Sequence, residues 1–449
     1  MATPTVQRRT SAPASRLARW MRAFRAALGR PLIAILVAFV LGGIIVMITT
    51  PGPLDNRFIT AVSSYYYLVL GSFGSIQSIS FTLAKATPLI FAGLAVAIAF
   101  RAGLFNIGAA GQLTVGSMAA GAIALRMPNM PGWVLVPLML LASIVAGGIW
   151  GGIVGVLKAW RGAHEVVTSI MLNWVAFYFC AYLVEGPFQA PKLSQQTLPL
   201  PAQATIPSLA VFYNQTLGSF LPQIPEPAQY TVDVGLLFAF IALVFYWFIT
   251  ARTTFGYELR VIGQNPKAAR YAGISVKKNI IMAMVLAGAF AGLAGSVRLM
   301  GQAPYQLISS AFATDSTGFD AIGVALLGRT TSIGVLLASL LFGGLQEAGP
   351  YLQGYVNVPG DIITIMQSLV LFSIAVEYLP SFQRFIPNFL SRSSKPALVP
   401  GVIDVKTPDM PADGTVTSGS GSADTSGNEA TGAGAETAGS ARAPLGQEE

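Results

Sequence analysis

Apolar runs of roughly 20 residues recur along the sequence from Pro31 to Leu379. A helix of that length crosses the hydrocarbon core of a bilayer, which is about 30 Å thick. A spanning segment must also satisfy its own backbone hydrogen bonds, so only helices and closed barrels qualify. The two-residue alternation of barrel strands is missing from the chain. We therefore expect an all-α polytopic membrane protein with about eight to ten transmembrane helices, some of them discontinuous.

The composition excludes several other classes of protein. Only 10% of the 449 residues are charged, whereas a soluble domain has about a quarter. The chain has one histidine, His164, and one cysteine, Cys180, which argues against a multi-ligand metal site and against a disulfide within the chain. We expect neither a metal centre nor a catalytic site. The net charge of +8 lies in short segments beside the apolar runs, so we expect no nucleic-acid partner.

The apolar runs define the transmembrane region, residues 31–380. The expected spans are 31–50, 83–100, 107–125, 133–157, 166–184, 232–250, 279–300, 319–345 and 361–379. Residues 59–76 form either a further span or an interfacial helix.

Basic residues indicate which ends of these spans face the cytoplasm. Residues 1–30 contain seven arginines, and no acidic residue precedes Asp55. The positive-inside rule therefore predicts a cytoplasmic N-terminus. The loops at 158–164 and 251–278 are also basic and fall on the same side if the spans are counted in order.

Two segments lack the character of spans. Residues 186–231 contain eight prolines, which favour extended, non-helical backbone, and we expect an external loop there. Residues 381–449 form an acidic tail rich in glycine, serine and threonine. Such a composition buries too little apolar surface to offset the entropy of ordering, so a disordered cytoplasmic tail is expected.

The basic loop at 251–278 contains the signals of a short helix. Asn265 is a favourable N-cap, Pro266 suits the first helical position, and Gly273 suits the residue after the helix. The residues between them are Lys267, Ala268, Ala269, Arg270 and Tyr271. Such a helix transmits force to a soluble partner or anchors the loop to anionic lipid headgroups.

Glycines and polar residues interrupt the apolar pattern in two places. In FRAGLFNIGAAGQ, residues 100–112, three glycines loosen the helix, while Asn106 and Gln112 provide amide donors and acceptors. Residues 315–331 are interrupted in a similar way. Transporters place broken helices where backbone and polar side chains contact solute, and paired breaks suggest an inverted repeat. The candidate pathway residues are Asn106, Gly108, Gln112 and Asp320. For the two amides, hydrogen bonding between helices is the alternative.

Other unusual residues have more ordinary interpretations. Arg101 and Arg329 are expected to pair with Asp320 or Asp315, or to reach the cytoplasmic interface. Arg298 is expected to extend toward an interface as well. The glycines at 147, 148, 151, 152 and 155 have the spacing of a close helix–helix contact.

Several motifs resemble the permease subunits of bacterial ABC importers, in the nucleoside and simple-sugar group related to the ribose and branched-chain amino-acid permeases. They are LAKATPLIFAGLAVAIAFRAGLFNIGAAGQLTVGS, RGAHEVVTSIMLN, GYELRVIGQNPKAARYAGIS and FDAIGVALLGRTTSIGVLLASLLFGGL. The resemblance covers about residues 80–380. It departs from the family at Ala110, where the usual Gly-Ala-Glu-Gly-Gln has a glutamate.

The resemblance implies an importer in the bacterial plasma membrane. It would contain a second permease, identical or different, cytoplasmic ABC ATPases and an external substrate-binding lipoprotein, with the helix at 265–272 coupling the chain to the ATPase. The chain has no Gly-Lys dipeptide and hence no P-loop. ATP would be used by the partner ATPase, and no cofactor is expected on this chain. A ribose or branched-chain amino-acid permease and an ion-coupled secondary transporter are the alternatives.

Overall fold

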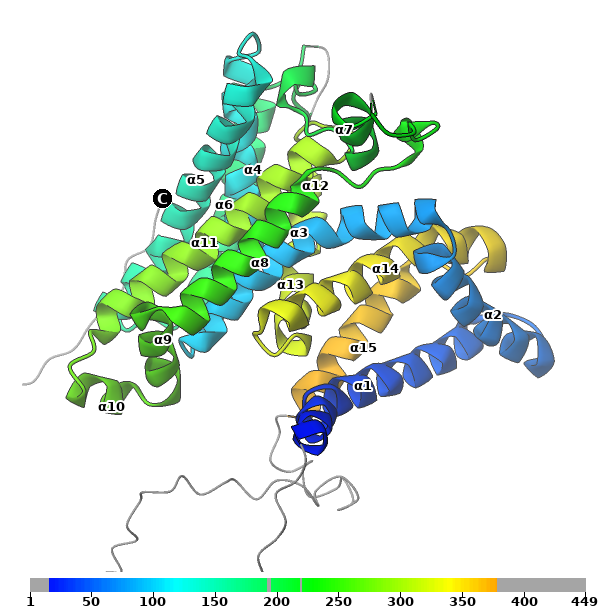
Figure 1. Cartoon of the computed structure of the whole chain (residues 1–449), viewed down its shortest axis with the longest axis horizontal. Coiled ribbons are helices and arrows are strands. Elements are labelled where there is room, and N and C mark those ends of the chain that lie inside the picture. Colours follow the sequence, from blue (N-terminus) through cyan, green and yellow to red (C-terminus); the bar gives the residue numbers. More distant parts are fainter. Residues whose placement is uncertain (1–15, 192–194, 219, 378–449) are drawn as a thin grey trace, which may run out of the picture. The chain divides into compact units, whose positions relative to one another are not determined.

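The structure is a computed structural model that describes residues 16–191, 195–218 and 220–377. Residues 1–15 and the expected disordered tail at 381–449 lie outside the described residues. Within these ranges the chain is built from helices (Figure 1), and extended pairing is limited to isolated bridges such as Gln189 with Thr197.

The longer helices overlap the predicted apolar runs or residues 59–76, except for one that lies in the basic loop at 251–278. They are α1 (Arg16–Thr49), α2 (Leu54–Phe73), α3 (Ile76–Arg101), α4 (Ala109–Arg126), α5 (Gly132–Arg161), α6 (Glu165–Glu185), α8 (Gly235–Arg252), α9 (Thr254–Gln264), α11 (Val276–Gly301), α13 (Thr317–Leu327), α14 (Ser332–Val356) and α15 (Asp361–Glu377). Shorter helices are α7 (Leu209–Thr216), α10 (Pro266–Tyr271), α12 (Ala311–Thr314) and the 3₁₀ turns Ala202–Ala204 and Pro227–Gln229.

Seven of the described helices are long and apolar enough to cross a membrane: α1, α3, α5, α6, α8, α11 and α14. This confirms the predicted all-α polytopic membrane protein. The expected eight to ten spans would also require shorter or more polar helices, such as α4 and α15.

Two local predictions were wrong. Residues 319–345 are not one span, because α13 ends at Leu327 and α14 begins at Ser332. Arg329 and Thr330 adopt φ values of 50° and 54°, a left-handed conformation that cannot continue a right-handed helix. The proline-rich loop at 186–231 is not wholly extended either. Ser208 caps α7 there by accepting a hydrogen bond from the amide of Val211 at 3.2 Å.

Glycines bring α5 and α11 into backbone contact. A Cβ atom on Gly288 would overlap the carbonyl oxygen of Gly147, and one on Gly151 would lie 3.0 Å from the Cα atom of Gly288. The hydroxyl of Ser143 also donates to Ser296 across the contact at 2.9 Å. The predicted packing role of the glycine run is confirmed at Gly147 and Gly151.

The central helices pack in an exchanged arrangement. The first central helix, α3, lies against α13 and α14, which follow α11 in the chain, while α11 lies against α4 and α5, which follow α3. The two central helices also run in opposite directions, because α3 ends and α11 begins beside α9. This exchange is what an inverted repeat would produce, although the repeat itself stays a prediction.

The loop that follows α6 ends on a buried carboxylate. Asp233 is 2% exposed, and its Oδ1 accepts a hydrogen bond from the amide of Gly235, at the start of α8, at 2.6 Å. Gly301, at the end of α11, leaves room for it, since a Cβ atom there would lie 2.7 Å from the Cγ atom of Asp233. Burial raises the pKa of Asp233 to about 7, although the Gly235 hydrogen bond opposes the shift.

Asp233→Asn is expected to stabilise the protein in a pH-dependent way. An aspartate in the unfolded chain has a pKa of about 3.9, so between about pH 4 and 7 unfolding releases a proton. Wild-type stability therefore falls as pH rises through this window, whereas the asparagine variant lacks this loss. The thermal unfolding midpoints in detergent should coincide near pH 4 and diverge by pH 8, in favour of the variant. A difference that is constant with pH would contradict this prediction.

Candidate functional site

The two predicted helix breaks lie side by side. The first break, residues 102–108, separates α3 from α4. The second predicted segment contains α13, flanked by non-helical residues at 315–316 and 328–331. Arg101 reaches the C-terminal end of α13, and Ala110 contacts its N-terminal end, where a Cβ atom on Gly318 would lie 2.5 Å from the Ala110 nitrogen. A larger side chain at 318 has no room, and Ala110 itself is 3% exposed.

Arg101 holds the turn between α13 and α14. Its Nη2 and Nε atoms donate to the carbonyl oxygen of Thr330 at 2.8 and 3.2 Å. The hydroxyl of Tyr246 on α8 donates to the same oxygen at 2.7 Å, and the guanidinium lies 5.5 Å from the centre of the Tyr246 ring. The expected pairing of Arg101 with Asp315 or Asp320 is wrong, because both carboxylates lie at the opposite end of α13.

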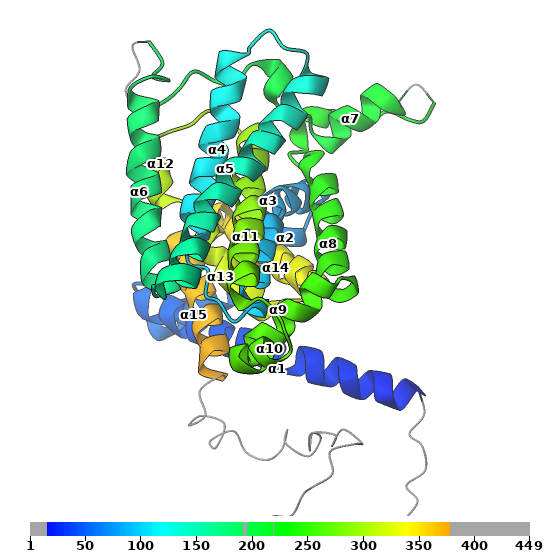
Figure 2. The ribbon, with the colours of Figure 1, turned by 90° about the vertical axis from the view of Figure 1, so that its left-hand side faces the viewer.

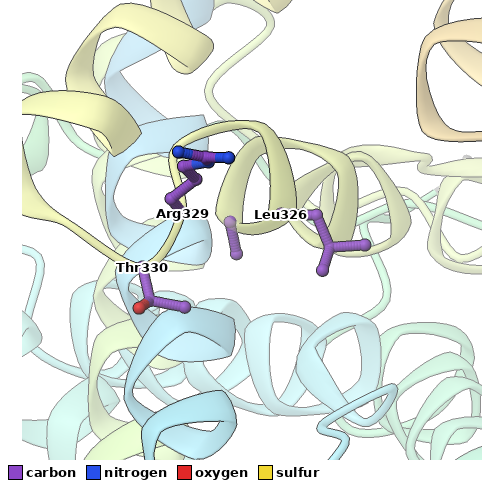
Figure 3. A pocket seen from close by; sticks show the side chains of 4 residues that line it. Leu326, Arg329 and Thr330 are labelled. Atoms are coloured by element: carbon purple, nitrogen blue, oxygen red, sulfur yellow. The ribbon is translucent and has the colours of Figure 1, made fainter. Parts of the chain in front are cut away.

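A small cavity adjoins this turn (Figure 3). Ala325, Leu326, Arg329 and Thr330 line its volume of about 230 Å³. The two left-handed residues of the turn, Arg329 and Thr330, therefore border this cavity at the C-terminal end of α13.

The side-chain amides of Asn106, in the first break, and Gln112, in α4, bind each other. Asn106 Nδ2 donates to Gln112 Oε1 at 3.0 Å, and Gln112 Nε2 donates to Asn106 Oδ1 at 3.2 Å. The amide of Gly108 donates to the same Asn106 oxygen at 3.1 Å, and both side chains are 0% exposed. In this conformation the pair therefore stabilises the break, and its contact with solute stays a prediction.

Asn173 on α6 is a residue that sequence reasoning missed. Its Oδ1 accepts a hydrogen bond from the amide of Gly111 at 2.9 Å, and its Nδ2 donates to the carbonyl of Ile107 at 3.0 Å. One side chain thereby binds a first-turn amide of α4 and a carbonyl of the break. Its place in the motif RGAHEVVTSIMLN was the available signal.

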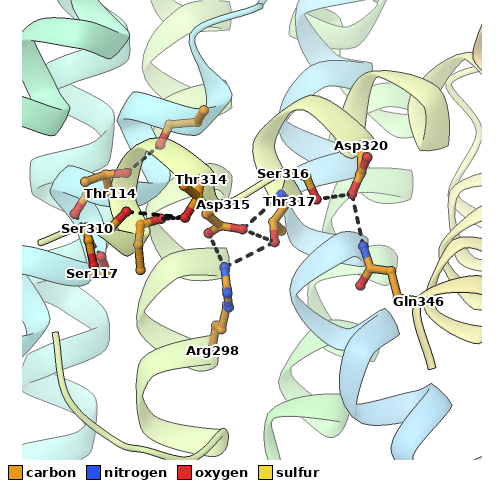
Figure 4. A network of polar contacts seen from close by, with 12 residues as sticks. Thr114, Ser117, Arg298, Ser310, Thr314, Asp315, Ser316, Thr317, Asp320 and Gln346 are labelled. Carbon is orange, nitrogen blue, oxygen red and sulfur yellow. Dashed lines mark hydrogen bonds and ion pairs between the residues drawn. The ribbon is translucent and has the colours of Figure 1, made fainter. Parts of the chain in front are cut away.

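Polar side chains from three helices and a connecting segment meet at the start of α13 (Figure 4). Arg298 of α11 pairs with Asp315, and Asp315 Oδ1 accepts from the amide and the hydroxyl of Thr317 at 3.0 and 2.7 Å. Asp320 Oδ2 accepts from the Ser316 hydroxyl at 2.7 Å and from Nε2 of Gln346, on α14, at 3.0 Å. We call these six residues the α13 cluster.

The α13 cluster is partly open to its surroundings. The side chains of Arg298 and Asp315 are 38% and 17% exposed, and Asp320 and Gln346 are half-buried. Charged groups at membrane depth face a water-filled cavity or another protein surface rather than lipid. Arg298 has Asp315 as a carboxylate partner, and its extension toward an interface stays a prediction. Sequence reasoning had singled out Asp315 and Asp320 but neither this pairing nor Gln346.

Both basic loops lie at the same end of the helices. Gly263 on α9 contacts the first break at Gly103, where a Cβ atom would lie 3.2 Å from the Gly263 Cα atom. Gly108, in the same break, approaches Ser169, near the start of α6. Figure 2 shows α9 and α10 at the lower end of the helices and α7, in the proline-rich loop, at the upper end. This agrees with the shared sidedness of the two basic loops that the charge pattern predicts.

The predicted capped helix is present as α10. Asn265 Oδ1 accepts hydrogen bonds from the amides of Lys267 and Ala268 at 3.0 and 3.1 Å. Gly273 follows the helix at a φ of 78°. Ala269 is buried against Ile262 and Val276, so it packs inside the loop. The outer face consists of the exposed residues Pro266, Lys267, Ala268, Arg270 and Tyr271.

Comparison with known proteins gives the family. The family model described as "Branched-chain amino acid transport system / permease component" matches residues 78–375. No solved structure matches the chain.

Three curated relatives match over most of their length. The chain is 36% identical to the guanosine ABC transporter permease protein NupP of Bacillus subtilis, over 78% of this chain and 94% of the relative. It is 36% identical to the nucleoside ABC transporter permease protein NupB of Lactococcus lactis, over 78% and 91%. It is 35% identical to the glucose ABC transporter permease protein TsgB13 of Haloferax volcanii, over 80% and 90%. The chain therefore belongs to the family of ABC transporter permeases described as "Branched-chain amino acid transport system / permease component".

Proposed function

We propose that this chain forms the translocation pathway of an ATP-driven importer of nucleosides or simple sugars. The observation that carries the proposal is the α13 cluster, a partly open set of charged, amide and hydroxyl groups between apolar spanning helices. Such groups bind hydroxyl-rich, uncharged solutes through hydrogen bonds. Relatives named for guanosine, nucleosides and glucose support the same class of solute.

The proposed assembly divides the work among several chains. A separate cytoplasmic ATPase hydrolyses ATP, an external lipoprotein delivers the solute, and a second permease, identical or different, completes the path. This chain binds no cofactor of its own and lies in the bacterial plasma membrane with both termini in the cytoplasm. The two basic loops at one end of the helices support this orientation.

Contacts that lead from the basic loop to the α13 cluster supply a route for coupling. Gly263 of α9 packs directly on the backbone of Arg101, whose side chain holds Thr330 at one end of α13. The other end of α13 carries Asp320. A movement imposed on α10 by the ATPase would therefore reach the cluster through packed backbone and one guanidinium.

Transport by the reconstituted complex tests the proposal. Proteoliposomes that contain the chain with its ATPase, binding protein and second permease are expected to take up guanosine, another nucleoside or glucose only when ATP is supplied. Uptake of leucine or ribose alone would favour the family alternatives. Uptake that persists without the ATPase and follows an ion gradient would overturn the proposal in favour of a secondary transporter.

Tyr271→Glu is expected to uncouple the complex. Tyr271 is 94% exposed at the end of α10, so a charge there leaves the loop folded but disturbs a docking surface. ATP-dependent uptake should fall at least about tenfold, as for a central interface residue, while membrane insertion stays normal. Tyr271→Phe keeps the ring and should transport normally. Equal uptake by Tyr271→Glu and wild type would remove α10 from the ATPase interface. Ala269→Glu should instead lower the protein level, because Ala269 is buried.

A further inference from the structure

We propose that Asp320 and Gln346 form a subsite that recognises sugar hydroxyl groups of the solute, such as those of a ribose or a hexose. This inference rests on the proposed function and adds a specific point of contact. It differs from the pathway residues Asn106 and Gln112, whose hydrogen-bonding groups are engaged with each other.

Two acceptor atoms in the α13 cluster, Asp320 Oδ1 and Gln346 Oε1, have no hydrogen-bond donor within the described residues. Both donors that reach Asp320, the Ser316 hydroxyl and the Gln346 amide nitrogen, bind its Oδ2 atom. Within the described residues, no hydrogen bond reaches Asp320 Oδ1 or Gln346 Oε1. Asp320 and Gln346 are half-buried, and neither acceptor is among the fully buried side-chain atoms that lack a partner; Figure 4 shows both side chains.

Asp320 differs from the other carboxylate of the cluster. Both oxygens of Asp315 are in use, one by Arg298 and the other by Thr317. Arg298 is thereby held on Asp315, and within the part of the chain that the structure describes no hydrogen bond or ion pair joins it to Asp320. The cluster therefore presents one carboxylate oxygen and one amide oxygen, both of which accept hydrogen bonds and neither of which donates.

Hydroxyl donors suit such a pair of acceptors. A carboxylate accepts charge-assisted hydrogen bonds from O–H groups, which are stronger than those between neutral groups. Asp320 Oδ1 and Gln346 Oε1 lie on either side of the hydrogen bond that joins the two residues, so each offers a separate contact to a hydroxyl group of the solute. Sites built to bind a hydroxyl also discriminate strongly against an analogue that lacks it, because the buried acceptor is then left unpaired. The subsite would therefore read the sugar rather than the base of a nucleoside.

The test compares turnover of a ribonucleoside and of its 2′,3′-dideoxy analogue in the reconstituted complex. Each solute is supplied at a concentration that saturates the binding protein, so that affinity for that protein does not enter the ratio. Wild type is expected to prefer the ribonucleoside by about tenfold or more. Asp320→Asn, which removes the charge and keeps the size, should bring the ratio close to one. Asp233→Asn, a buried carboxylate outside the cluster, serves as the matched control and should keep the wild-type ratio.

Each other outcome has a definite meaning. A wild-type preference that Asp320→Asn leaves unchanged would overturn the subsite while leaving the proposed function in place. Equal loss of both solutes, with less assembled complex, would place Asp320 in the contact with the second permease and also overturn it. Faster turnover of a 2′-amino analogue than of the ribonucleoside would make the site a cation site instead. Failure to transport any nucleoside or sugar would overturn the proposed function itself.

Discussion

Gly288→Ala is expected to remove most of the folded protein. The added methyl group would overlap the carbonyl oxygen of Gly147 and lie 2.8 Å from its carbonyl carbon, so the clash is with backbone. Rotamer changes cannot relieve it, and α5 and α11 would have to separate along their contact. Overpacking usually costs about 1–3 kcal/mol, and a backbone clash between two closely packed helices belongs at or above the top of that range.

A second glycine of the same contact provides the control. At Gly152 the nearest atom to an added methyl group is Cγ2 of Val285, at 3.1 Å, and it belongs to a side chain that can move. Gly152→Ala should therefore give nearly the wild-type amount of monodisperse protein in size-exclusion chromatography, whereas Gly288→Ala should give little. Similar yields from both variants would mean that α5 and α11 do not pack as closely as this structure has them.

Local chemistry explains which parts of the fold could be predicted. The α10 helix was predictable because its cap, its first-turn proline and its terminal glycine are all adjacent in sequence, at Asn265, Pro266 and Gly273. The break after Arg101 was predictable for the same reason, since glycines and amides interrupt an apolar run. The direction in which Ala269 faces was not, because it depends on packing against Ile262 and Val276.

The errors concern features that hydropathy does not register. Residues 319–345 are apolar enough for one span, yet two left-handed residues, Arg329 and Thr330, divide them. Those residues also present the Thr330 carbonyl to Arg101, and no sequence pattern indicates that a backbone oxygen will serve as the partner of a charge. The ion pair of Arg298 with Asp315 joins residues on either side of a connection that leaves the helical path after Gly301, so helical spacing could not reveal it.

The candidate site was partly predictable. Asp320 was selected because it lies in one of the two segments where glycines and polar residues interrupt the apolar pattern. Its neighbour Gln346 lies in α14, and only the chain reversal after α13 brings the two together. Asn106 and Gln112 were selected for their amides, but the sequence could not show that the two amides would bind each other.

Arg101→Gln is expected to abolish ATP-dependent uptake while leaving the protein folded. The guanidinium makes two hydrogen bonds to Thr330 and contacts the Tyr246 ring, and it is the side-chain link between the end of α3 and the end of α13. Hydrogen bonds from charged groups contribute about 1.5–3 kcal/mol. Loss of this link should lower uptake by more than about tenfold if it lies on the coupling route. Folding should survive, because Tyr246 still donates to the same carbonyl.

Tyr246→Phe is the matched variant, since it removes the other donor to the Thr330 carbonyl and keeps the ring beneath Arg101. If the turn needs only to be held in place, both variants should reduce uptake to a similar extent and should lower the unfolding midpoint together. If Arg101 transmits movement, Arg101→Gln should lose uptake while ATP hydrolysis continues. In Tyr246→Phe, uptake should stay coupled to ATP hydrolysis. The deciding measurement is the ratio of solute transported to ATP hydrolysed. That ratio must fall in Arg101→Gln alone. Of the two residues, only Arg101 has its own backbone in contact with Gly263 of the basic loop.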